Sequence, residues 1–263
     1  MTVRPSEVAE VHTRLQKATL ELEASREYWS RADGVQPVSA RRAFEEAWLG
    51  PRSLKRTEEL LVHLRARYDA FPPALQVLHR WPSIDPDTRR LICHWHLQLS
   101  DPLYRAFTGE YLVQRRDSLR PEVTSDTVVS WVTTRSGDRW AVSTRVQFAS
   151  RLLSSAFSAG LLSSNRGARR IQTQRAGDRA LEYLLYLLRQ VTFEGSLLAN
   201  PYLRSVGFEG RVLEDRLRQL PALRFRRQGD LVEFGWVHAD LLSWARATFP
   251  EVRHVTPRAR EVG

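Results

Sequence analysis

The chain has 263 residues, of which 42% are hydrophobic and 27% charged, a composition typical of a folded protein and not of a disordered one. No apolar run approaches the roughly 18 residues needed to span a bilayer, and the N-terminus lacks a signal-peptide pattern. The single cysteine, Cys93, excludes an internal disulfide and a cysteine-based zinc site. We therefore expect a cytoplasmic protein.

Positive charge is concentrated in the second half of the chain. Lys and Arg together number 40 against 30 Asp and Glu, which gives a net charge of +10, and all but two of the 40 are arginine. Residues 1–140 carry a net charge of +2 and residues 141–263 a net charge of +8. Such a localised excess is typical of a protein that binds a polyanion. An arginine-rich composition that serves only solubility is the alternative.

The first 121 residues are predicted to be helical throughout. Apolar residues from Val8 to Leu22 recur at helical spacing and indicate a first helix over residues 6–31. In the helix predicted over residues 53–68, Arg67 is expected to face water. Capping residues and prolines mark the starts of the further helices. These starts are expected at Ser39, Ser53, Pro72, Asp85 and Asp101.

Beyond Pro121 a helix, a turn, a longer helix and a hairpin are predicted over residues 124–174. Ser125 or Asp126 suits the N-cap of the short helix, and Ser143 suits that of the longer one. The longer helix is expected to turn Val146, Ala149, Leu152, Leu153, Ala156 and Phe157 inward. The stretch LLSSNRGARRIQTQ that follows is typical of a strand, a loop and a second strand.

The same order recurs over residues 196–236. Short and longer helices are predicted over residues 196–206 and 211–220, with Val212 on the inner face of the second. A hairpin follows, with its turn at Arg227–Asp230. The helix that begins at Asp178, between the two copies, is apolar on nearly every face and should be buried.

These elements predict a mainly α protein in three parts. Residues 1–121 form an all-helical N-terminal domain, and residues 122–194 form a first winged-helix-like unit with the buried connecting helix. Residues 195–263 form a second winged-helix-like unit with a small β-hairpin.

The repeated unit points to nucleic acid. The major groove of B-DNA admits one α-helix, and a hairpin beside it can contact the backbone, where the planar arginine fork can bind two phosphate oxygens. The second helix of the second unit also carries two acids, which weakens its case. Basic residues on a short edge strand can also serve only to prevent aggregation. The expected nucleic-acid contacts are Thr144, Arg145, Gln147, Arg151, Arg166, Arg169, Arg170, Arg211, Arg218, Arg224, Arg226 and Arg227.

No motif indicates catalysis. Neither lysine follows a glycine as a phosphate-binding Walker A loop requires, and no nuclease-like carboxylate cluster is visible. His94 and His96 point about 200° apart on a helix, so they cannot share a metal ion. Asp240, near His238, is better explained as a helix N-cap. We expect no enzyme activity, no metal site and no cofactor.

Three segments carry a resemblance to a known family: SARRAFEEAWLGPRSLKRTEELLVHLRARYDAF, DTRRLICHWHLQLSDPLYRAFTGEYL and WAVSTRVQFASRLLSSAFSAGLLSS. Within the third, Ser143-Thr144-Arg145 leads into an apolar helix that ends in Gly-Leu-Leu. Over residues 38–240 the chain resembles the BrxA family of BREX bacteriophage-defence systems. The resemblance implies a helical part similar to the RNA-binding antitermination factor NusB, helix-turn-helix units with basic surfaces, DNA binding and a non-enzymatic role in defence.

The expected function is therefore that of a non-enzymatic accessory protein of a defence system, which binds double-stranded DNA with little or no sequence preference. Two alternatives stay open. The helical first half could bind RNA as NusB does, or the basic half could dock an acidic partner among other defence-system proteins. Neither the oligomeric state nor the role of the first 35 residues follows from the sequence.

Overall fold

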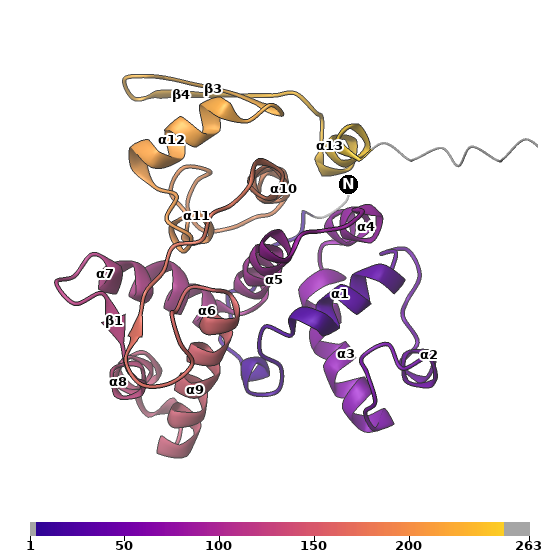
Figure 1. Cartoon of the computed structure of the whole chain (residues 1–263), viewed down its shortest axis with the longest axis vertical. Coiled ribbons are helices and arrows are strands. Elements are labelled where there is room, and N and C mark those ends of the chain that lie inside the picture. Colours follow the sequence, from indigo (N-terminus) through magenta and orange to yellow (C-terminus); the bar gives the residue numbers. More distant parts are fainter. Residues whose placement is uncertain (1–3, 250–263) are drawn as a thin grey trace, which may run out of the picture.

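The computed structural model describes residues 4–249; residues 1–3 and 250–263, the ends of the first and third predicted parts, lie outside the described range. The chain is mainly helical, as expected, and it has two small antiparallel strand pairs. Figure 1 shows helices α1 to α4 on one side of α5, helices α6 to α9 on the other side, and the β3–β4 ribbon at one end. In the described part, no helix is both long and apolar enough to cross a bilayer.

The N-terminal helices pack around α5, whose side chains from Leu91 to Ser100 are all buried. Helices α1, α3, α6 and α10 lie against it (Figure 1). The predicted N-caps Ser39, Ser53, Asp85 and Asp101 each accept a hydrogen bond from the backbone N–H three residues on. The elements are α1 (Leu22–Arg31), α2 (Ala40–Glu45), α3 (Leu54–Tyr68), α4 (Pro72–Arg80), α5 (Pro86–Ser100), α6 (Pro102–Ala106), the π-helical turn η2 (Phe107–Tyr111) and α7 (Leu112–Arg116).

The predicted first helix over residues 6–31 is wrong in its first half. Residues 4–20, here called the N-terminal strap, are irregular apart from a single bridge at Ser6 and the short 3-10 helix η1 (Arg14–Gln16), and within the predicted range only α1 is α-helical. The strap bonds to distant backbone: Glu7 N–H donates to Thr192 O at 3.0 Å, and Val8 N–H to Leu99 O at 2.9 Å. The strap does not form an α-helix although its apolar residues have helical spacing. These backbone N–H groups are satisfied by distant carbonyl groups instead of by carbonyl groups within a helix.

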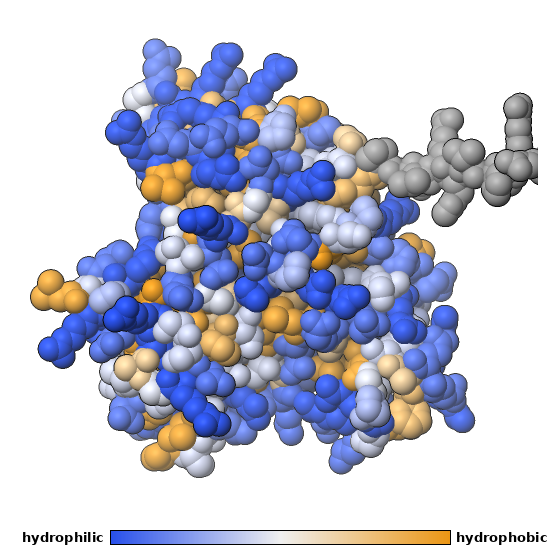
Figure 2. Space-filling view, in the orientation of Figure 1, coloured by the Kyte–Doolittle hydropathy of each residue, from blue (hydrophilic) through white to orange (hydrophobic). Residues whose placement is uncertain are grey.

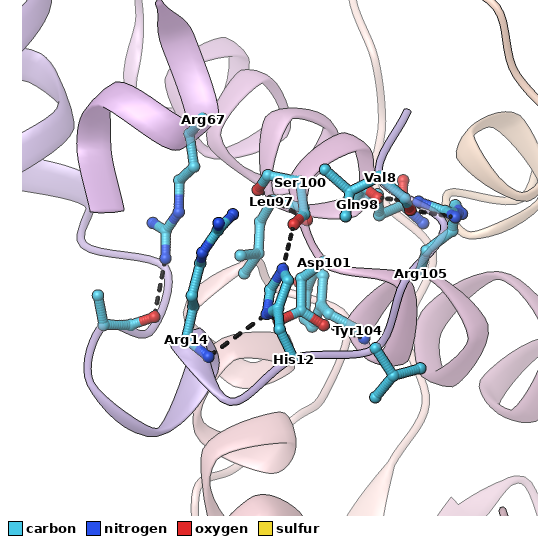
Figure 3. Close-up of polar contacts among 12 residues, drawn as sticks. Val8, His12, Arg14, Arg67, Leu97, Gln98, Ser100, Asp101, Tyr104 and Arg105 are labelled. Atoms are coloured by element: carbon cyan, nitrogen blue, oxygen red, sulfur yellow. Dashed lines mark hydrogen bonds and ion pairs between the residues drawn. The ribbon is translucent and has the colours of Figure 1, made fainter. Parts of the chain in front are cut away.

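Arginines of the folded body hold the carbonyl groups of the strap. Arg67, expected in water, is instead only 4% exposed and donates to Ala18 O and Leu20 O at 2.8 and 3.1 Å (Figure 3). Arg105 donates to Val8 O at 2.9 Å. The prediction for Arg67 failed because the carbonyls it satisfies belong to a segment that was expected to be helical.

His12 fixes the middle of the strap to the junction of α5 and α6. Its Nε2–H donates to Ser100 O at 2.9 Å, and its Nδ1 lies 3.7 Å from a carboxylate oxygen of Asp101 (Figure 3). Asp101 is buried, and its other oxygen accepts the Tyr104 N–H at 2.9 Å. Burial raises the pKa of the Asp101 carboxyl above its usual range.

The segment 122–174 contains the predicted helix pair and a small sheet. β2 pairs antiparallel with β1, which the sequence did not reveal, and Leu162 forms a bridge with Ile171. The segment after α9 therefore lies on the other side of β2 from β1. Ser163 N–H donates to Arg170 O, and Gln172 N–H donates to Leu161 O. The elements are β1 (Glu122–Val123), α8 (Ser125–Ser136), the 3-10 turn η3 (Gly137–Arg139), α9 (Val142–Ser158) and β2 (Arg169–Arg170).

Details of the α8–α9 pair differ from the prediction. Thr124, not Ser125 or Asp126, caps α8 in a capping box with Thr127. α9 begins at Val142, before the expected cap Ser143. Its inner face is centred on Phe148, whose ring stacks on Trp140 with 4.2 Å between centroids.

Two residues expected on the inner face of α9 lie outside. Val146 is 49% exposed and Phe157 38% exposed, whereas the four inner positions at 149, 152, 153 and 156 are buried as predicted. Phe148 occupies the inner position one turn from Leu152, so Val146 is rotated toward solvent.

The segment 178–249 completes the fold. α10 is buried on nearly all sides, as predicted, and lies against α5 and α13. α11 is only one turn long, capped by Asn200, rather than the helix expected over residues 196–206. Val212, expected inside, is 60% exposed. The elements are α10 (Asp178–Arg189), α11 (Pro201–Arg204), α12 (Gly210–Gln219), β3 (Leu223–Gln228), β4 (Leu231–Trp236) and α13 (Leu241–Thr248).

Candidate nucleic-acid interface

One face of α9 is exposed along the whole helix. Gln147 and Arg151 lie on it, whereas Thr144 and Arg145 are half-buried and Arg145 donates to Gly137 O at 2.6 Å. The sequence prediction did not include the serines on this exposed face. Their helical spacing, opposite the apolar positions of α9, would have indicated that they face solvent. These exposed serines are Ser143, Ser150 and Ser154.

The loop between α9 and β2, residues 163–168, carries exposed Arg166, and β2 carries exposed Arg170. Arg169 is different, because it is only 5% exposed. Its guanidinium donates to Asn165 O at 2.8 Å and to Gly167 O at 2.7 Å, and burial lowers its pKa. The expectation that Arg169 contacts phosphate is therefore wrong, since strand alternation turns it inward beside Val123 while Arg170 faces out.

Three predicted arginines of the second unit are engaged with carboxylates. Arg218 lies 2.7 Å from an Asp215 oxygen and 3.1 Å from a Glu214 oxygen, and Arg211 lies 4.0 Å from Asp215. Arg227 pairs with Glu214. Arg227 was expected in the turn, but it belongs to β3 on the side of the hairpin that faces α12, which brings it to Glu214.

The outer side of the β3–β4 ribbon carries the remaining pair. Arg224 and Arg226 are exposed and alternate with Leu223 and Phe225, which are buried as predicted. Glu233 stands opposite Arg226 in the register, but no ion pair within 4.0 Å joins Arg224 or Arg226 to a carboxylate of the described chain. Figure 2 shows hydrophilic side chains projecting from this end of the molecule.

The two units differ in their charge balance. Residues 122–177 contain eight arginines and three acidic residues, a net charge of +5, whereas residues 195–248 contain eight arginines and six acidic residues, a net charge of +2. Arg175, which was not among the predicted contacts, is also exposed and lines a polar cleft of about 580 Å³ with Gln172 and Gln174. The free positive charge therefore lies mainly on the first unit.

The two histidines of α5 belong to the core. His94 bonds to Tyr104 Oη at 2.9 Å and to Ser205 Oγ at 2.8 Å; His96 bonds to Arg67 O at 3.0 Å and to Tyr183 Oη at 2.7 Å. Burial lowers the pKa of His94 to about 3 and that of His96 to about 4. Across residues 4–249, no group of three or more His, Cys, Asp or Glu side chains is placed to hold a metal ion.

Comparison with known protein families and with characterised proteins gives no match. Among solved structures, the chain is similar to the crystal structure of an uncharacterized protein from Magnetospirillum magneticum. The two share 15% sequence identity, and the alignment covers 75% of this chain and 98% of the other with a TM-score of 0.57. At this identity, the likeness concerns the mainly helical fold alone.

Proposed function

We propose that the protein is a non-enzymatic accessory protein that binds double-stranded DNA with weak or no sequence preference. In this proposal the first unit is a winged helix in which α9 enters the major groove and the 163–168 loop is the wing. The order of β1, α8, α9 and the strand–loop–strand segment, with β1 paired to β2, supports it.

The observation that carries the proposal is the net charge of +5 on residues 122–177 together with the exposure of Arg151, Arg166 and Arg170. Arg151, Arg166 and Arg170 have no carboxylate within 4.0 Å in the described chain. When exposed guanidinium groups neutralise phosphates, the counterions condensed on the DNA are released. This release supplies most of the affinity for non-specific DNA. The small serines around Arg151 allow a close approach of the DNA backbone to α9.

The resemblance to BrxA supports a role in bacteriophage defence, in the cytoplasm of a bacterium and together with other defence-system proteins. The NusB-like character of the N-terminal helices belongs to the same proposal. The second unit contributes less to DNA binding here, because only Arg224 and Arg226 of its expected contacts lack an ion pair among the described residues.

Fluorescence anisotropy with a labelled 20-bp mixed-sequence duplex, between 50 and 200 mM salt, tests the proposal. We expect micromolar or tighter binding that weakens steeply with salt. The triple variant R151E/R166E/R170E should lose most of the affinity and lower the slope of log K against log salt by about 3.

The control is the single charge reversal Arg41→Glu on α2, at a side chain that is 84% exposed and lies in the helical body. It should leave the salt slope unchanged. Equal affinity of the wild type and the triple variant would contradict the proposal. Tighter binding of a structured RNA than of duplex DNA, in direct competition, would favour the RNA-binding alternative instead.

A further inference from the structure

The loop between α9 and β2 is built around the buried side chain of Arg169. The two ends of its guanidinium fork hold Asn165 O and Gly167 O, on either side of Arg166. Ser164 Oγ donates to Arg166 O at 2.8 Å, and Gly167 has a φ of +67°, which favours glycine. Three side-chain hydrogen bonds shorter than 3 Å therefore hold three successive carbonyl groups of this turn.

This arrangement places a single long side chain at the apex of a narrow loop. The neighbours of Arg166 are small: Ser164, Asn165, Gly167 and Ala168. The loop is also tied at its base, where Ser163 Oγ accepts the Arg170 N–H at 3.0 Å. A backbone that is ordered before binding loses less entropy on association, so the apex is prepared to present Arg166 to a partner.

We infer that Arg166 enters the minor groove of A·T-rich duplex DNA and that Arg169 is the positioning residue that aims it. The inference rests on the proposed function and adds a groove and a base-composition preference to it. The minor groove is only about 6 Å wide, so it excludes a helix but admits one arginine carried on a tip of small residues. Runs of A·T pairs narrow this groove and strengthen its negative potential, which attracts an inserted guanidinium.

Inosine-substituted DNA separates the two grooves. An I·C pair lacks the guanine N2 amino group, so its minor groove presents the same acceptors as A·T, whereas its major groove matches G·C. Three 20-bp duplexes with a central A·T, G·C or I·C tract would be titrated by fluorescence anisotropy. We expect the A·T and I·C duplexes to bind about 3- to 10-fold more tightly than the G·C duplex.

Two variants test the two residues. Arg166→Ala should abolish the preference, so that all three duplexes bind alike. Arg169→Lys keeps the net charge but cannot hold two carbonyls with one fork. It should lower the A·T to G·C affinity ratio at least threefold while the salt slope stays unchanged, and hydrogen exchange should show faster opening of residues 164–168. Arg41→Glu again serves as the control and should keep the ratio.

The outcomes are distinguishable. If the wild type binds all three duplexes equally, or if the I·C duplex behaves as the G·C duplex does, the minor-groove inference is overturned and the proposed DNA binding stands. If none of the duplexes binds, the proposed function fails, and the inference with it. If Arg169→Lys keeps the wild-type ratio of A·T to G·C affinity, Arg169 does not position Arg166, and only the minor-groove contact by Arg166 stands.

Discussion

At the scale of single residues, identical arginines have three different fates. Arg166 is exposed, Arg169 is buried against carbonyl groups of its own loop, and Arg218 is held by two carboxylates. The sequence predicted one role for all three, because each lies in a basic segment. What separates Arg169 from Arg170 is the pairing of β2 with β1, a contact between segments more than forty residues apart. Local composition does not contain that information.

The second unit allows a prediction at this scale. Glu214 pairs with both Arg218 and Arg227, so it withdraws two arginines from the surface charge. Glu214→Gln should free Arg227 and leave Arg218 with Asp215 as its one carboxylate partner. It should raise duplex-DNA affinity about 3- to 10-fold at 50 mM salt, with the gain shrinking as salt rises. Anisotropy titrations of this variant and of Glu45→Gln on α2, which pairs with Arg41, measure the effect. A gain of the same size in Glu45→Gln would assign it to net charge alone.

At the scale of elements, helices with local signals were predicted well. A cap residue acts on the N–H three positions on, so α2, α3, α5 and α6 begin where the sequence indicated. The N-terminal strap was missed because its partners, such as Thr192 and Leu99, are remote in the chain. The apolar periodicity correctly predicted that Leu15 and Ala18 are buried, but it did not predict that they reach the core without an α-helix.

The strap should matter for stability as well as shape. Leu15 is 1% exposed in η1, which lies against α9, so this contact joins the strap to the proposed DNA-binding helix. Leu15→Ala should lower the free energy of unfolding by about 2–5 kcal/mol. It should also speed hydrogen exchange in α9. Urea denaturation and hydrogen exchange measure both, and the exposed strap residue Glu10, changed to Ala, should alter neither by a comparable amount.

At the scale of the whole molecule, one core runs through the helical body and both basic units. Buried polar groups tie the parts together: His94 joins α5 to Ser205, and His96 joins it to Tyr183 of α10. The mainly helical class, the β3–β4 hairpin and the buried α10 could be predicted from the sequence. The β1 strand and the extra sheet pairing could not, because a two-residue strand has no periodicity of its own.

The buried histidines make stability depend on pH. Burial lowers the pKa of His94 to about 3 and of His96 to about 4 in the folded protein, whereas both titrate near 6.5 when unfolded. Their contribution is complete above about pH 6.5 and is lost as the pH falls toward 4, because the unfolded state then binds about two more protons. Between pH 6 and 4.5 we expect a loss of about 2–3 kcal/mol per pH unit.

Asp101 acts in the opposite direction. Its raised pKa means that the protonated carboxyl favours the folded state at low pH, and this contribution is lost as the pH rises through the folded value. The two histidines outweigh one carboxyl, so the net effect is acid destabilisation. Urea midpoints measured between pH 7.5 and 4.5 check the sign, and a midpoint that stays constant or rises on acidification would show that these histidines are not held neutral in the core.

The bonds between the strap and Thr192 also constrain the order of assembly during synthesis. Pro5 and Glu7 leave the ribosome long before the residues that receive them, since Thr192 is translated some 185 positions later. The strap can therefore dock on Thr192 only after almost the whole of the described fold has been synthesised.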